Sequence, residues 1–201
     1  MERKSDATRA AIVETALALA SQEGLEALSL GPLADAMKMS KSGVFTRFGS
    51  RSTLQMAVLQ NYHGQFQRRV LQPALAARQG LPRLRALFSS SLAHIGEPRP
   101  AGCFYISCAA EYDDRPGPLR HELTSGVLAW RALFEQSVAQ AVELGQLAAS
   151  ADKGQMVFEI YGLLLAVQHD MRLLERSGSV SQAQQAFEQL LLRHLADGAG
   201  S

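Results

Sequence analysis

The sequence predicts an all-α protein, and three observations lead to this expectation. Apolar residues recur at spacings of three and four over long stretches. Alanine, leucine, glutamine and glutamate, which are good helix formers, dominate most of the chain. No segment shows the alternation of apolar and polar residues that is typical of a half-buried strand. The length of 201 residues suits a small N-terminal domain over residues 1–50 and a larger helical domain over residues 51–201.

The first predicted helix covers residues 6–23 and carries one apolar stripe. The stripe consists of Ile12, Val13, Ala16, Leu17 and Ala20. Gly24 follows the helix directly, where a glycine can take the positive φ of a C-terminal cap. We expect the long helix from Ser50 onward to support the N-terminal domain, because its short helices alone bury too little apolar surface.

Residues 28–54 predict two short helices joined by a tight turn and followed by a long helix. Ser29 can cap the first short helix, and Pro32 costs little in its opening turn. Ser40 can cap the second, over residues 41–48, whose Val44 and Phe48 lie four residues apart and face inward. Lys41, Ser42, Thr46 and Arg47 are left facing outward, and Gly49 and Ser50 end this helix and start the long one. This pattern is a helix-turn-helix, so the sequence predicts binding to double-stranded DNA.

The net charge of the chain is only +1, yet its charges are unevenly distributed. No acidic residue occurs between Asp35 and Glu97. The basic residues in that interval are Lys38, Lys41, Arg47, Arg51, Arg68, Arg69, Arg78, Arg83 and Arg85. Clustered lysine and arginine side chains neutralise phosphates, so the part of the molecule that holds the helix-turn-helix suits a polyanion.

The rest of the chain predicts further helices separated by glycine- and proline-containing turns. They cover residues 50–72, 82–95, 103–112, 118–144, 153–174 and 181–195. Pro73 is expected to end or kink the first of them, and Asp152 to cap the helix from residue 153.

The last two predicted helices, about 153–174 and 181–195, contain more apolar residues than one face can use. A helix that is apolar nearly all round is normally buried on two sides. We therefore expect a four-helix interface between two copies of the chain, which makes a symmetric homodimer. The alternative is that these helices lie in the core of a large monomeric bundle.

Several classes of protein find no support in the sequence. There is no run of about 18 apolar residues, so no membrane span is expected. The charged N-terminus leads into an amphipathic helix and not into a signal peptide, which predicts a cytoplasmic protein. Cys103 and Cys108 are too few for a disulfide framework and are expected to be reduced thiols, with a redox role for either left open.

Motifs for metal binding and catalysis are also missing. The histidines are scattered, without a spacing that would set metal ligands on one helical face, so no metal site is predicted. No glycine-rich phosphate loop and no nucleophile motif occurs, so we expect neither a cofactor nor enzyme activity.

Residues 9–62 resemble the N-terminal domain of TetR-type (TetR/AcrR) bacterial transcriptional regulators. The shared features are Glu23-Gly24 at the end of the first helix, Leu33-Ala34, Ser40 at the start of the recognition helix, the aromatic Phe45, Phe48 before a small turn, and Ser50-Arg51 leading to Leu54. Beyond this domain, only the all-helical layout is similar to the effector-binding and dimerisation domain of the family.

The resemblance implies which residues meet DNA. It places Lys41, Ser42, Gly43, Val44, Phe45, Thr46 and Arg47 in the major groove or beside phosphates, with Arg51 gripping the backbone. The hydroxyls of Ser29, Ser42 and Ser50 can donate to phosphates, and Lys38 adds a charge nearby.

The sequence departs from the family pattern at three of these positions. Phe45 replaces a tyrosine and loses a hydroxyl, and Arg51 replaces a lysine and keeps the charge. Lys38 stands where a glycine is common, so a positive φ there would cost about 1 kcal/mol.

The resemblance further implies a ligand-responsive repressor that acts as a homodimer on a near-palindromic operator, with a small, largely apolar effector in the helical body. The candidate effector residues are Phe66, Phe88, Phe104, Tyr105, Trp130, Phe134, Phe158 and Tyr161. For each of them the alternative is plain core packing. For the whole protein the alternative is a helical dimer that acts through protein partners, with the helix-turn-helix as a scaffold only.

Overall fold

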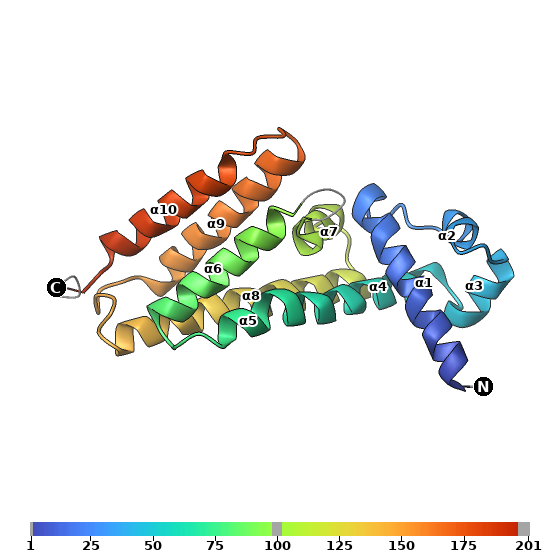
Figure 1. The fold of residues 1–201 in the computed structure, drawn as a ribbon, viewed down its shortest axis with the longest axis horizontal. Helices are drawn as coiled ribbons and strands as arrows, with labels where there is room; N and C mark the ends of the chain where they lie inside the picture. Colours follow the sequence, from blue (N-terminus) through green and yellow to red (C-terminus); the bar gives the residue numbers. More distant parts are fainter. Residues whose placement is uncertain (1, 98–101, 197–201) are drawn as a thin grey trace. The chain divides into compact units, whose positions relative to one another are not determined.

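The computed structural model describes residues 2–97 and 102–196, which form helices and no β-strand (Figure 1). This confirms the predicted all-α fold. The chain divides into two compact units. The N-terminal unit holds the residues up to Gln65 together with 104–126, and the C-terminal unit holds residues 66–103 and those from Val127 onward. The assignment of DNA binding to residues 1–50, and of effector binding and dimerisation to residues 51–201, stays a prediction.

The N-terminal unit contains α1 (Glu2–Glu23), α2 (Leu30–Ala36), α3 (Lys41–Phe48), α4 (Arg51–Phe66), α7 (Phe104–Tyr112) and the first residues of α8 (Pro118–Glu143). The whole predicted stripe of α1 is buried, with Ile12 and Ala16 completely inaccessible. Gly24 ends α1 with φ +96°, as a C-terminal glycine cap requires. Both features of the first helix are therefore confirmed.

The predicted caps are confirmed at two of three serines. The Oγ of Ser40 accepts from the N–H of Gly43 at 3.1 Å, and the Oγ of Ser50 accepts from the N–H of Thr53 at 3.1 Å. Ser29 occupies the N-cap position of α2, but its side chain makes no capping hydrogen bond, so this prediction was wrong. A capping side chain accepts from the second or third helical residue, and the third residue of α2 is Pro32, which has no N–H.

The long helix does not end at Pro73, which was one of the two outcomes predicted there; instead the helix is distorted just before the proline. It passes from α4 through a π-helical turn, Gln67–Leu71, into α5 (Gln72–Leu75). In the π-turn the N–H of Gln72 donates to the carbonyl of Gln67, five residues earlier. An α-helical proline lacks an N–H and clashes with the carbonyl four residues before it. The wider π-turn accommodates Pro73 without breaking the helix.

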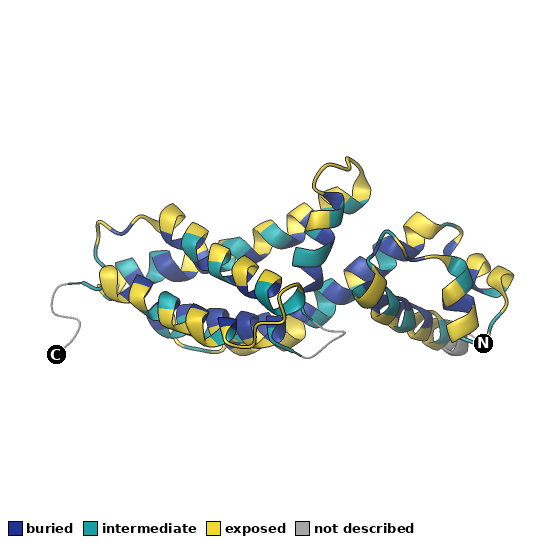
Figure 2. Cartoon of the chain, turned by 90° about the horizontal axis from the view of Figure 1, so that it is seen from above, coloured by how far each residue is buried: buried dark blue, intermediate teal, exposed yellow. Residues whose placement is uncertain are grey.

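The C-terminal unit is built from the π-turn, α5, α6 (Leu81–Ile95), the remainder of α8, α9 (Lys153–Arg172) and α10 (Ser179–Arg193). Asp152 caps α9 as predicted, accepting from the N–H of Gln155 at 3.0 Å. Across the core, the rings of Phe88 and Phe187 stack with their centroids 4.0 Å apart. Figure 2 shows that the helices carry buried residues along one side and exposed residues along the other.

None of the helices in the described part of the chain combines the length and the apolarity that crossing a bilayer requires.

Lys38 closes the turn between α2 and α3 with φ +53°, so the cost expected for a positive φ at this position applies. Because its Cβ is strained in this conformation, Lys38→Gly should raise the free energy of unfolding by about 0.5–1 kcal/mol. Urea denaturation followed by circular dichroism measures the change. Lys38→Ala is the matched control, since it removes the same charge but keeps the Cβ. Equal stabilities of the two variants would contradict the assignment of strain to this residue.

Candidate nucleic-acid interface

Helix α3 presents one face to the core and the other to solvent. Val44 is fully buried and Phe48 is 5% exposed, so these two side chains anchor the helix as predicted. Lys41, Ser42 and Thr46 are exposed, as predicted. Val44 therefore supports the recognition helix from within, and its side chain forms no part of the exposed face.

The exposed face of α3 carries an aromatic side chain and a cation, Phe45 and Lys41. Phe45 is 51% exposed although it is a large apolar side chain. The side chain of Lys41 extends toward α2, where its Cε would lie 3.4 Å from a Cβ at Gly31. A cation and an exposed aromatic ring thus lie on the same short helix, beside the start of α2.

Arg47 is held against its own helix and is only half exposed, in contrast to the outward position expected. Its Nη1 donates to the carbonyl of Gly43 at 2.7 Å. Its Nε is buried and has no hydrogen-bond partner within the described structure. An unpartnered buried donor is costly, so this guanidinium gains a partner if it swings out toward an acceptor such as a phosphate or a guanine edge.

The start of α4 brings several hydroxyl groups together at a helix N-terminus. The Oγ of Ser50 lies 3.0 Å from that of Ser52 and 2.8 Å from the Oγ1 of Thr53. Ser52 and Thr53 are exposed, in the first turn of the helix. Helix N-termini carry partial positive charge and bind anions, so this turn can receive a phosphate.

Arg51 faces the loop between α1 and α2. Its Nε donates to the carbonyl of Leu28 at 2.9 Å, and its Nη2 donates to the carbonyl of Glu26 and lies 3.2 Å from the Oε1 of Glu26. The structure therefore gives this guanidinium a role in holding the loop that leads into α2.

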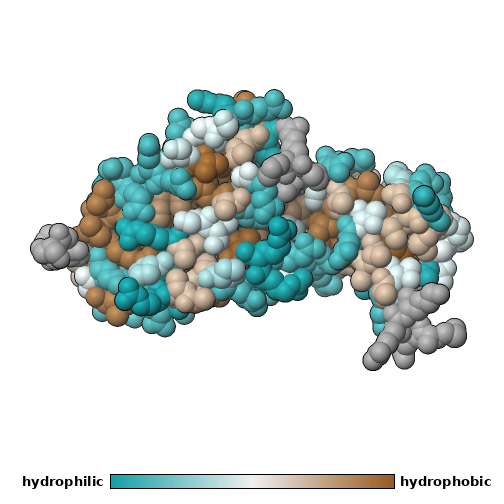
Figure 3. Space-filling view, in the orientation of Figure 1, coloured by the Kyte–Doolittle hydropathy of each residue, from teal (hydrophilic) through white to brown (hydrophobic). Residues whose placement is uncertain are grey.

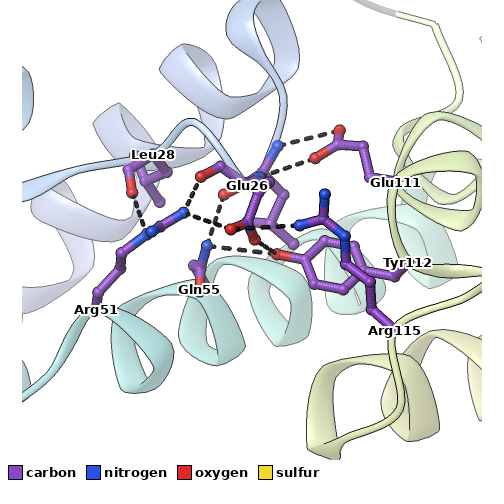
Figure 4. A network of polar contacts seen from close by, with 8 residues as sticks. Glu26, Leu28, Arg51, Gln55, Glu111, Tyr112 and Arg115 are labelled. Carbon is purple, nitrogen blue, oxygen red and sulfur yellow. Dashed lines mark hydrogen bonds and ion pairs between the residues drawn. The ribbon is translucent and has the colours of Figure 1, made fainter.

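Other side chains of the N-terminal unit complete a polar network around the same loop (Figure 4). The Nε2 of Gln55 donates to the carbonyl of Leu25 at 2.8 Å. The carboxylate of Glu111 accepts from the N–H groups of Leu25 and Glu26 at 3.2 and 2.8 Å. Tyr112 donates to Glu26 at 2.8 Å. Two N–H groups and three carbonyls of the loop thus have partners on α4 or α7.

The network fixes the charge of Glu26. The hydrogen bond from Tyr112 holds the pKa of Glu26 below its ordinary value against the effect of burial, and the charges of Arg51 and Arg115 act in the same direction as Tyr112. Burial, together with Glu26, raises the pKa of Tyr112, so the phenol remains a donor. Sequence reasoning did not find Glu26, Gln55, Glu111 or Tyr112, because no local pattern links residues about 85 positions apart.

The candidate effector residues fall into separate groups. In the C-terminal unit the ring of Trp130 lies 5.2 Å from Phe66, 5.6 Å from Tyr161 and 6.4 Å from Phe134. Phe88 stacks on Phe187. In the N-terminal unit Phe104 and Tyr105 pack on Tyr62 with centroids 5.2 and 5.0 Å from it.

Phe158 lies apart from these groups, 65% exposed on α9. The group around Trp130 holds four of the predicted residues and has polar neighbours of its own. The indole Nε1 of Trp130 donates to the Oγ of buried Ser91 at 3.3 Å, and the guanidinium of Arg131 lies 4.9 Å from the ring centroid of Tyr161.

Two further features of the described residues bear on ligands other than DNA. No group of three or more His, Cys, Asp or Glu side chains in them is arranged to hold a metal ion. A surface hollow of about 400 Å³ lies in the N-terminal unit, between the first turns of α4 and the turn that precedes α8, and none of the candidate aromatic residues lines it.

Comparisons with known proteins agree with this geometry. Residues 12–58 match the model of bacterial regulatory proteins of the tetR family. Residues 80–187, more than half of the chain, match the model of the tetracyclin repressor-like C-terminal domain. A search of curated proteins found no match.

Solved structures share the fold. A TetR transcriptional regulator from Chloroflexus aurantiacus has a TM-score of 0.87 and 20% identity, over 96% of this chain and 98% of that chain. A TetR-family regulator from Cytophaga hutchinsonii has a TM-score of 0.81 and 17% identity, over 96% of each chain. AibR, in complex with isovaleryl coenzyme A and operator DNA, has a TM-score of 0.71 and 22% identity, over 90% of this chain and 96% of its own. From the two family matches and the shared fold, we conclude that the chain belongs to the TetR family of bacterial transcriptional regulators.

Proposed function

We propose that this protein is a ligand-responsive repressor that binds a near-palindromic operator as a homodimer. The observation that carries the proposal is the two-sided character of α3. Val44 and Phe48 fix the helix in the core, while Lys41, Phe45 and Thr46 occupy its exposed face. A short helix anchored in this way, at the second position of a helix-turn-helix, is suited to enter the major groove.

Each exposed group of α3 has a DNA partner that suits its chemistry. Lys41 and an outward-turned Arg47 can donate to guanine O6 and N7 or to a phosphate, and Phe45 can contact a thymine methyl. The Oγ1 of Thr46 donates to the carbonyl of Ser42 at 2.7 Å, which leaves its methyl for apolar contact. Ser29, Ser50 and the first turn of α4 can receive phosphates, and Lys38 adds a charge at the turn.

The homodimer is supported by an apolar strip on α9. Phe158, Gly162 and Leu165 lie at spacings of four and three on one side of the helix, with Phe158 65% and Leu165 38% exposed. Met156, Ile160 and Leu164 on the opposite side are fully buried, and α9 packs against α6 and α10. Figure 3 shows apolar residues reaching the surface of the C-terminal unit among hydrophilic ones.

The strip fits a second copy of the same chain. A Cβ at Gly162 would meet nothing within 4 Å, so there is open space at this position, one helical turn from the exposed ring of Phe158. Across a two-fold axis the Phe158 ring of each copy can fill the gap at Gly162 of the other. Leu192, 56% exposed, is a further apolar side chain on α10, the other helix of the proposed interface.

The effector is proposed to bind beside the aromatic group of Trp130, Tyr161, Phe66 and Phe134. A group of apolar rings with a few polar neighbours suits a small organic ligand, and Ser91 and Arg131 are available as polar neighbours. The similar fold of AibR was solved in complex with both isovaleryl coenzyme A and operator DNA, which supports a ligand-controlled DNA binder here.

The test of DNA binding begins with operator fragments selected from genomic DNA by the whole protein. The double variant Lys41→Ala and Arg47→Ala should lose specific binding, because each base contact contributes about 1–3 kcal/mol. If a residue contacts only phosphate, its variant should instead reduce the salt slope by about 0.9. Titrations at several salt concentrations distinguish the two cases. Arg78→Ala, an exposed arginine of the C-terminal unit, is the control and should bind normally. Unchanged binding by the double variant would favour the scaffold function.

The test of the dimer is Phe158→Glu. A carboxylate in the apolar strip would be buried without a partner, so the variant should sediment as a monomer at micromolar concentration, where the wild type sediments as a dimer. Leu128→Glu is a matched control, because Leu128 is a similarly exposed residue, at 59%, on α8. A dimer that persists in Phe158→Glu and dissociates in Leu128→Glu would assign the interface to another face.

The test of the effector site uses Trp130, which is the only tryptophan of the chain. A ligand that releases DNA should change the tryptophan emission with the same midpoint as DNA release, because it binds against this ring. Tyr161→Ala should raise the ligand concentration needed for both effects by about tenfold, or about 1.4 kcal/mol. DNA release without any change in emission would place the effector elsewhere.

A further inference from the structure

The loop between α1 and α2 leaves backbone donors that neither helix can satisfy. After Gly24 the chain turns away from α1, so no carbonyl of that helix accepts from the N–H groups of Leu25 and Glu26. Leu25 is fully buried, so water cannot reach its surroundings freely. A single carboxylate solves this problem: the Oε1 of Glu111 accepts from Leu25 at 3.2 Å and its Oε2 accepts from Glu26 at 2.8 Å.

The loop is shaped to admit this carboxylate. A Cβ at Gly24 would lie 3.0 Å from the Oε1 of Glu111 and 3.2 Å from its Cδ, closer than ordinary contact. The φ of +96° at the same glycine directs the two following N–H groups toward α7. Glycine is thus needed here twice, for its backbone conformation and for the approach of Glu111.

We infer that Glu111 is a positioning residue for DNA binding, in that its carboxylate fixes the loop from which the helix-turn-helix begins. The inference rests on the proposed function. The loop runs directly into α2, and α2 packs on α3, so a displacement of the loop also displaces the recognition helix α3. Glu111 itself lies on α7 and is bound to the loop's backbone, so it is not available to DNA.

The inference predicts a change in DNA affinity opposite to the one expected from charge alone. Removing a negative charge from a DNA-binding protein ordinarily strengthens its attraction to phosphate. Glu111→Gln should instead weaken specific binding at least tenfold, because the amide can accept from one of the two N–H groups but presents its NH₂ to the other. The salt slope should stay unchanged, since no phosphate contact is lost.

The experiment compares Glu111→Gln with Asp114→Asn on the operator fragment selected by the wild-type protein. Asp114 is exposed three residues further along the chain, and its variant removes the same charge without touching the loop. Amide hydrogen exchange at Leu25 and Glu26, measured by NMR, provides a readout that a general loss of stability would not produce alone. The expected result is faster exchange at these two amides and weaker DNA binding in Glu111→Gln, with neither change in Asp114→Asn.

Other outcomes overturn the inference in distinguishable ways. If Glu111→Gln binds DNA as well as Asp114→Asn or better, Glu111 has no positioning role. If Glu111→Gln fails to fold, Glu111→Asp replaces it; this variant keeps the charge but is too short for both hydrogen bonds, and normal DNA binding by it overturns the inference. If the wild-type protein prefers no fragment over random DNA, the proposed function itself fails, and the Glu111 inference fails with it.

Discussion

The polar backbone groups of the loop between α1 and α2 need partners, and the arrangement of the N-terminal unit depends on supplying them. Two of the loop's N–H groups donate to Glu111, and three of its carbonyls accept from Gln55 and Arg51. Leaving one buried group of this kind unpaired costs about 1–3 kcal/mol, which is a large part of the stability of a small domain. A three-helix domain that ended at residue 50 would lack every one of these partners.

This requirement explains why α7 belongs to the compact N-terminal unit although it follows the C-terminal unit's α6 in the chain. The start of α7 is held in the same manner. The N–H of Phe104 donates to the hydroxyl of Tyr62 at 3.1 Å within the N-terminal unit. The N–H of the preceding residue, Cys103, donates to Gln168 at 3.1 Å within the C-terminal unit. Neighbouring residues are thus tied to different units, and the chain passes from one to the other between them.

Much of the fold could be predicted from the sequence because it depends on local rules. The apolar stripe of α1 and the caps at Ser40, Ser50 and Asp152 all follow from residues within one or two helical turns. The missing cap at Ser29 also has a local contribution, because Pro32 lacks the N–H that a third helical residue ordinarily offers to a capping serine.

The features that sequence reasoning missed depend on distant partners or on side-chain conformation. Glu111 meets Leu25 across about 85 positions, and no periodicity connects them. The candidate effector aromatics could be identified one by one, but their division between the two units depends on how the helices pack. Arg47 lies along its helix because its guanidinium reaches the carbonyl of Gly43. Helical periodicity gives the direction of its Cα–Cβ bond but not the conformation of the side chain beyond it.

The π-turn over Gln67–Leu71 affects how this sequence is aligned with others of the family. A π-turn holds one residue more than an α-turn between the same two hydrogen-bonded groups. Phe66 before it and Ala74 after it both face the core, and they keep these faces only while the extra residue is present. A relative with an uninterrupted α-helix here would be one residue shorter, so a correct alignment has to open a single-residue gap in the middle of a helix, where alignments ordinarily allow none.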